Sequence, residues 1–167
     1  GTLLEPVSST KVADVTLVHA LSTGIGRADL LVPGIVFAKD ALQPEALTPL
    51  TFGVIADVNG SVSGDGHIAW TPDGVTSTGV FRTAGTDLAA AFGPVTGIAT
   101  EIRFTDLLNL QSAPGQVATI RTLNPGIPVS DGTIRYQTLP GARVRVEGGA
   151  WPFAGGSLTL DPTLLDF

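Results

Sequence analysis

The chain has 167 residues, a net charge of −6 and only 14% charged residues, whereas 43% of its residues are hydrophobic. This length suits one domain, and the composition excludes intrinsic disorder, which combines low hydrophobicity with high net charge. Lys11 and Lys39 are the only lysines, and no basic cluster is present, which argues against a nucleic-acid partner. The absence of cysteine excludes disulfides and thiolate metal sites, and no apolar run is long enough to span a membrane.

The first third of the chain predicts short strands separated by turns. Alternating apolar residues over 12–21 predict a strand. We expect a second strand over 27–32 that ends at Pro33-Gly34, and a short buried strand over 35–37. Because proline fits the first turn of a helix but not its interior, we expect one short helical turn after Pro44.

The middle of the chain predicts one hairpin after another. Residues 52–58 alternate as in a strand, and Asn59-Gly60 is a strong signal for a two-residue hairpin turn. The returning strand holds residues 62–70, and Thr71-Pro72-Asp73-Gly74 predicts a turn with proline at its second position. Residues 75–83 then predict another strand.

The second half continues in the same way. Residues 86–92 fit either a short helix or a strand of small residues, and 97–106 is the clearest strand in the chain. Further strands are expected over 116–123, 133–138, 143–147 and 157–160, with a bulged corner at 151–156. The chain therefore predicts ten or more strands, no long helix and an all-β antiparallel meander.

Glycines inside the predicted strands indicate bulges and strong curvature; they are Gly64, Gly66, Gly148 and Gly149. Two architectures satisfy the pattern: an open, curved sheet and a closed β-sandwich. Alternation alone does not distinguish them.

One short unit occurs twice. Asp65-Gly66 and Asp131-Gly132 each precede a strand in which Ile68 and Trp70 align with Ile134 and Tyr136. We interpret residues 52–92 and 116–160 as repeat units of a repetitive sheet. Since the chain has no methionine and starts with Gly1, we expect residues 1–167 to be a single β-rich segment of a larger protein.

The sequence shows no catalytic or metal-binding pattern, and no cofactor is expected. The two histidines, His19 and His67, have no ligand spacing around them, and no Gly-x-Ser-x-Gly motif is present. The Asp-Gly pairs at 65, 73 and 131 lack the acidic ligands of a calcium loop and predict turns. We therefore expect a protein that is not an enzyme.

A set of motifs in the C-terminal half resembles the YdbH-like family of large envelope proteins, which are relatives of AsmA and TamB. The motifs occur in one order along the chain and include an Asn-Pro-Gly turn, an Asp-Gly pair and a Trp-Pro-Phe-Ala-Gly-Gly segment. Their residues are Asn124, Pro125, Gly126, Asp131, Gly132, Trp151, Pro152, Phe153, Gly155 and Gly156. Pro114-Gly115-Gln116 and Pro162-Thr163 flank them, and the resemblance extends upstream to Gly60.

This resemblance implies a periplasmic segment of an envelope protein that an N-terminal helix outside these residues anchors in the inner membrane. Family members look like bridges whose repetitive sheets curl into a U-shaped, β-taco-like groove that carries phospholipids toward the outer membrane. The implied partners are phospholipid acyl chains, with a small outer-membrane lipoprotein or neighbouring β-segments added by strand pairing. An older family label implies a domain associated with dicarboxylate transport.

Strand alternation selects the side chains that would face acyl chains in such a groove. They are Ile98, Ile102, Phe104, Ile134, Tyr136, Val144, Val146, Leu158 and Leu160. One unnoticed bulge inverts the faces of a strand, so each assignment depends on the register. The competing interpretation is a structural module that pairs with partner proteins through the edges of its sheet.

Overall fold

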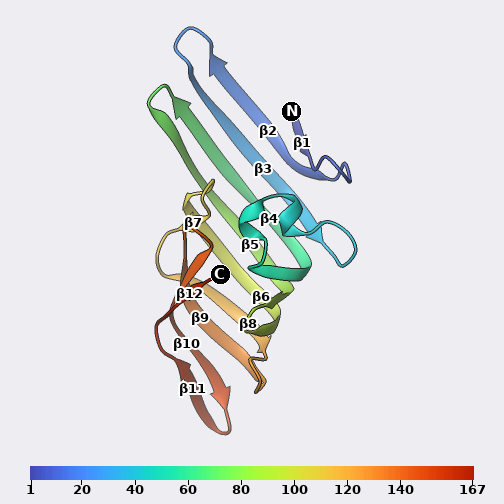
Figure 1. Cartoon of the computed structure of the whole chain (residues 1–167), viewed down its shortest axis with the longest axis vertical. Helices are drawn as coiled ribbons and strands as arrows, with labels where there is room; N and C mark the ends of the chain where they lie inside the picture. The colour runs from blue at the N-terminus through green and yellow to red at the C-terminus, as the bar shows by residue number, and fades with distance from the viewer.

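A computed structural model describes all 167 residues as twelve strands and two 3-10 helical turns (Figure 1). The strands are β1 Thr2–Leu4, β2 Lys11–Ala20, β3 Ile25–Phe37, β4 Ile55–Thr71, β5 Gly74–Ala90, β6 Gly93–Asp106, β7 Gln111–Ser112, β8 Gln116–Leu123, β9 Val129–Leu139, β10 Arg143–Phe153, β11 Gly156–Leu160 and β12 Thr163–Asp166. The helical turns are η1 Pro44–Ala46 and η2 Pro49–Thr51. The helical turn expected after Pro44 is confirmed, and residues 86–90 of the ambiguous stretch belong to β5.

All strands belong to one open antiparallel sheet. Its order is β1-β2-β3-β4-β5-β6-β8-β9-β10-β11, with β7 paired to β6 and β12 paired to β10. β1 and β11 lie at opposite ends of the molecule and do not pair (Figure 1). The predicted all-β antiparallel meander in an open sheet is therefore confirmed, and the closed sandwich is wrong.

The hairpin predicted at Asn59-Gly60 is wrong, because β4 runs through both residues. The register of β4 against β5 shifts on either side of Asn59, which marks bulges, and Gly60 has a φ of 150°. Thr86 of β5 lies so close that a Cβ at Gly60 would come within 2.5 Å of its Oγ1. The glycine thus permits a close approach of two strands instead of a turn.

Three further turn signals also lie inside strands. Pro33-Gly34 forms a bulge in β3, so the two predicted strands on either side of it are one. Asp65-Gly66 lies within β4 and Asp131-Gly132 within β9, where Asp131 has a φ of 57°. Only Asp73-Gly74 lies at a turn, between β4 and β5. Bulges and turns use the same residue types, and the paired neighbouring strands decide between them.

The C-terminal end differs from the prediction in two ways. Trp151 and Phe153 belong to β10, and the turn to β11 lies at Ala154-Gly155 instead of forming a bulged corner. A last strand that the sequence pattern missed, β12, follows β11. β11 pairs with the second half of β10 and β12 with its first half, so both lie along the same edge. The division into repeat units over 52–92 and 116–160 stays a prediction.

The buried side chains form two clusters, and only 25 residues of the chain are buried. The first cluster lies in the N-terminal half and consists of Ala13, Val32, Ile35, Phe37, Leu42 and Val58. The second lies in the C-terminal half and consists of Val95, Ile120, Val129 and Trp151. Residues 38–54, which contain both helical turns, pass over the sheet near β4 and β5 and contribute Leu42 to the first cluster (Figure 1). No comparable segment contributes to the second.

Candidate binding groove

An apolar groove of about 730 Å³ occupies one face of the C-terminal half of the sheet. Strands β6, β8, β9 and β10 supply its floor, and β11 and β12 supply one side. Its lining is Val54, Ile55, Leu88, Ala90, Phe92, Val95, Ile98, Thr100, Ala118, Ile120, Leu123, Pro125, Ile127, Val129, Ile134, Tyr136, Val144, Val146, Trp151, Phe153, Leu158, Thr159, Leu160, Thr163, Leu165 and Phe167. Of these 26 residues 22 are hydrophobic and none is charged.

Seven of the nine side chains selected by alternation line this groove. They are Ile98, Ile134, Tyr136, Val144, Val146, Leu158 and Leu160. Ile102 and Phe104 do not line it, although they alternate in phase with Ile98 along β6. Phe104 instead meets the ring of Phe81 edge-on, with 6.0 Å between the ring centroids. The groove ends between Thr100 and Ile102, because β8 flanks β6 only as far as Thr100.

The sequence pattern missed the side chains that turns and the last strand contribute. Phe92 and Ile127 come from the β5–β6 and β8–β9 connections, and Leu165 comes from β12. Alternation identifies strand faces and says nothing about loops, so the turn residues had no signal. Ala118 and Ile120 alternate within a correctly predicted strand, and that alternation alone marks them as one face.

Trp151 forms the base of the groove and is only 3% exposed. Its indole lies flat over two glycines: a Cβ at Gly132 would come within 1.8 Å of its Nε1, and one at Gly149 within 2.8 Å of its Cζ3. No side chain fits at either position without displacing the ring. This explains why a glycine follows Asp131 inside a strand. The buried indole Nε1 has no hydrogen-bond partner.

The remaining motif residues build the connections around the groove. Asn124 accepts a hydrogen bond from the Gly126 amide through its Oδ1 at 3.1 Å, which shapes the β8–β9 loop that places Pro125 in the lining. Gly155 has a φ of 80° in the β10–β11 turn, and Pro152 pairs with the strand after that turn. Gly156 begins β11.

One polar pair interrupts the apolar wall. The Tyr136 hydroxyl lies 3.0 Å from Oγ1 of Thr100, which itself donates to the Val117 carbonyl at 2.8 Å. The Thr100 hydroxyl has one proton, and it donates that proton to the Val117 carbonyl. The Tyr136 hydroxyl must therefore donate to Thr100, so it has no proton left to donate to a ligand. Burial raises the pKa of Tyr136, which keeps the hydroxyl neutral. The groove wall therefore offers no charged side chain, and its only other hydroxyls belong to Thr159 and Thr163, two exposed residues on the β11 and β12 side.

Residues 4–167 match the YdbH-like family model, whose description is intermembrane phospholipid transport protein YdbH. The chain belongs to the YdbH-like family. No curated protein and no solved structure matches the chain. The resemblance inferred from the turn motifs is therefore confirmed over essentially the whole chain. None of its helices has the length and apolar character to cross a membrane.

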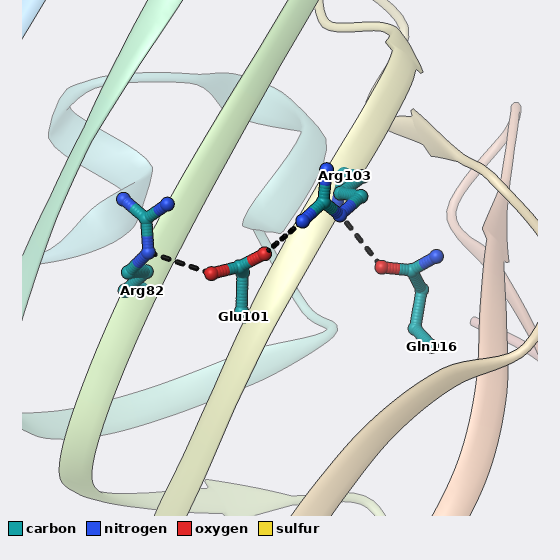
Figure 2. Close-up of polar contacts among 4 residues, drawn as sticks. All are labelled: Arg82, Glu101, Arg103 and Gln116. Atoms are coloured by element: carbon teal, nitrogen blue, oxygen red, sulfur yellow. Dashed lines mark hydrogen bonds and ion pairs between the residues drawn. The ribbon is translucent and has the colours of Figure 1, made fainter.

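A group of charged side chains on β5 and β6 of this YdbH-like chain lies on the face opposite to the groove. Figure 2 shows one group, in which Glu101 of β6 accepts hydrogen bonds from Nε of Arg82 at 2.7 Å and from Nη2 of Arg103 at 2.6 Å. The Arg103 backbone amide donates to Oε1 of Gln116 at 2.9 Å. The hydrogen bond from Arg82 is the main cause that holds the pKa of Glu101 below its ordinary value. This is an exposed ladder of ion pairs that links neighbouring strands.

The arginines of the last strands also point away from the groove. Arg135 alternates with Ile134 and Tyr136, and Arg145 alternates with Val144 and Val146, all four of which line the groove. Arg145 donates to the Gln137 side chain at 3.1 Å. A ligand head group inside the groove therefore meets none of these cations.

The two histidines form separate hydrogen bonds. His19 Nδ1 accepts from the Trp70 indole at 3.1 Å, and His67 Nδ1 lies 2.6 Å from the Asp29 carboxylate. No group of three or more histidine, cysteine, aspartate or glutamate side chains is placed to hold a metal ion.

Proposed function

We propose that this chain carries phospholipids by their acyl chains along the apolar groove, without catalysing a reaction. It would act as one segment of a periplasmic bridge that is anchored in the inner membrane and leads to the outer membrane. The observation that carries the proposal is the uncharged groove of about 730 Å³ left open by a chain of an intermembrane phospholipid transport family. Contiguous apolar surface on this scale is rare on proteins that bind nothing through it.

The energetics of such a surface suit transport. Each acyl methylene moved from water into the groove gains about 0.8 kcal/mol, so a tail is held firmly without polar contacts. The wall is made mostly of aliphatic and aromatic side chains along its length, and no charged side chain fixes one position. A tail in this groove is therefore retained but free to slide, and the head group stays in water.

The dicarboxylate alternative finds little support in the groove. A small dianion needs arginine or lysine side chains or several free donors at its site. The groove lining contains no charged residue, and the hydroxyl pair of Tyr136 and Thr100 is satisfied internally. The two remaining hydroxyls, those of Thr159 and Thr163, do not replace a cation.

A role in strand pairing is a second candidate, because one observation favours it. The outer edges of β11 and β12 pair with nothing, and β2 is covered by β1 only near Lys11–Asp14. Open edges accept further strands. We propose that neighbouring β-segments or a small outer-membrane lipoprotein extend the sheet at these edges, which would lengthen the groove.

Native mass spectrometry of the purified chain tests the lipid proposal. We expect phospholipid to remain bound after purification, with head groups in proportion to the membrane because only the tails are held. A lipid-free chain that also takes up no lipid from phosphatidylcholine vesicles would contradict the proposal. Proline substitution at Leu164, a residue of the β12 edge that does not line the groove, separates the second candidate. Loss of a partner with retained lipid shows that pairing and lipid binding are independent.

A further inference from the structure

Residues 38–54, here named the cover segment, lie over an apolar floor that closely resembles the open groove. Leu42 belongs to the buried cluster beneath it, and Leu47 packs against the same cluster. The floor consists of β-strand side chains, chiefly Val32, Ile35 and Phe37. In Figure 1 the two helical turns of the cover segment lie over β4 and β5, beside the strands that build the groove.

The covered floor and the open groove are one continuous face of the sheet. Gly64 pairs with Val32 on one side and with Phe81 on the other, and Phe81 pairs with Ile102 of β6. Ile102 alternates in phase with Ile98, which lines the groove. Leu88 packs against both clusters and lines the groove at their boundary. The cover segment reaches this boundary, because its Val54 lines the groove.

The cover segment is attached to the sheet by few contacts. Its hydrogen bonds to a strand are all made by Gln43, whose side-chain amide donates to the Val58 carbonyl and accepts from the Val58 amide, both at 2.8 Å. The same amide nitrogen donates to the Ala38 carbonyl at 2.8 Å. Within the segment only Leu42 and Pro44 are buried. A segment with so few buried contacts opens at a lower free energy than the strands below it.

We propose that the covered floor is a second acyl-chain section of the groove and that the cover segment is a removable plug held by Gln43. The inference rests on the proposed function, because the ligand is the same acyl chain. With the plug in place, a tail that slides along the groove stops at Leu88 and Val54–Ile55. Passage toward β3 requires Gln43 to leave Val58, which exposes the floor near Phe81.

A photo-crosslinking residue at Phe81 tests this proposal, with the same residue at Ile134 as the reference for the open groove. The chain is mixed with phosphatidylcholine vesicles, and lipid adducts are quantified by mass spectrometry. We expect adducts at Ile134 and almost none at Phe81. In Gln43→Glu, which loses both donated hydrogen bonds but keeps its size, Phe81 labelling rises roughly tenfold as the open population grows, while Ile134 labelling is unchanged.

Matched variants keep the outcome interpretable. Thr48→Ala removes a hydrogen bond within the cover segment and none to the sheet, so its labelling stays as in the parent chain. Leu47→Ser weakens the contact with the floor without touching Gln43 and is expected to raise Phe81 labelling as well. The plug is overturned if Phe81 is labelled equally in the parent chain and in Gln43→Glu. It is also overturned if Phe81 stays unlabelled in both Gln43→Glu and Leu47→Ser while Ile134 is labelled. An unlabelled Ile134 overturns the lipid proposal itself and, with it, the plug.

Discussion

The two halves of the sheet present similar apolar faces but treat them differently. In the N-terminal half the chain covers its own face with residues 38–54, and Leu42 is 8% exposed. In the C-terminal half the face stays open, and Leu158 in the wall is 45% exposed. The same chain thus contains a device for closing an apolar face and does not use it over the groove. This difference points to an external occupant of the open half.

The largest expected effect concerns the base of the groove. Trp151→Ala removes a fully packed indole and leaves a cavity over Gly132 and Gly149, which costs about 3–5 kcal/mol of unfolding free energy. Trp70→Ala in the other half removes a half-exposed ring over Gly26 and is expected to cost clearly less. Urea denaturation of both variants measures the difference. Equal losses would contradict the assignment of Trp151 as the centre of the C-terminal core.

Leucine truncation compares the covered and open faces directly. Leu42→Ala leaves a cavity beneath the cover segment and is expected to cost about 2–3 kcal/mol. Leu158→Ala removes a side chain that the fold itself leaves exposed. The unfolding free energy of a lipid-free sample therefore falls by less than about 1 kcal/mol. Denaturation midpoints of delipidated protein give both values. A loss at Leu158 as large as that at Leu42 would mean that the groove is closed in solution.

A charge in the open groove is expected to expel its occupant. Ile134→Lys places an ammonium group among apolar side chains, where an acyl chain does not solvate it. We expect the lipid bound per chain to fall roughly tenfold, which corresponds to about 1.4 kcal/mol. Lipid extraction followed by mass spectrometry measures it, with Arg135→Lys on the opposite face as the control. Retained lipid in Ile134→Lys would place the tails elsewhere.

The smallest expected effect is the pH dependence of the ion-pair ladder. The pKa of Glu101 is lowered in the folded chain, chiefly by the hydrogen bond from Arg82. The ionised carboxylate therefore stabilises the fold above the ordinary glutamate pKa of about 4.3. This stabilisation is lost as the pH falls through the lower pKa of the folded chain. Glu101→Gln removes this contribution at every pH. Thermal unfolding midpoints are measured for the parent chain and for Glu101→Gln between neutral pH and about pH 3. The two midpoints differ at neutral pH and converge at the acid end. Parallel curves would contradict the sign.

Strand identity and class were predictable because alternation and short connections are local properties of the sequence. The strand over 116–123 was predicted with its bounds, and the strand expected over 97–106 is the greater part of β6. The full length of the long strands was not predictable. Asn59-Gly60 and Pro33-Gly34 are residue pairs typical of both turns and bulges, so the sequence does not show which of the two they form. That choice is made by distant strands, such as the close approach of Thr86 to Gly60.

The groove was predictable to the extent that it follows strand faces. Seven of the nine selected side chains, Ile134 and Tyr136 among them, line the groove, and their contact with lipid stays a prediction. The extent of the groove along β6 depends on where β8 begins and ends. The sequence pattern did not predict that residues 38–54 cover part of the apolar face. The role of Gln43 follows from its contact with Val58, fifteen residues away, which no local signal records.

The central claim is that acyl chains occupy the open half of the sheet, and a pair of neighbouring positions on β9 tests it most directly. A photo-crosslinking residue at Ile134 faces the groove, whereas one at Arg135 faces the opposite side of the same strand. After illumination with phosphatidylcholine vesicles, the account predicts lipid adducts at Ile134 and none at Arg135. Equal labelling at both positions, or labelling at Arg135 alone, would contradict it.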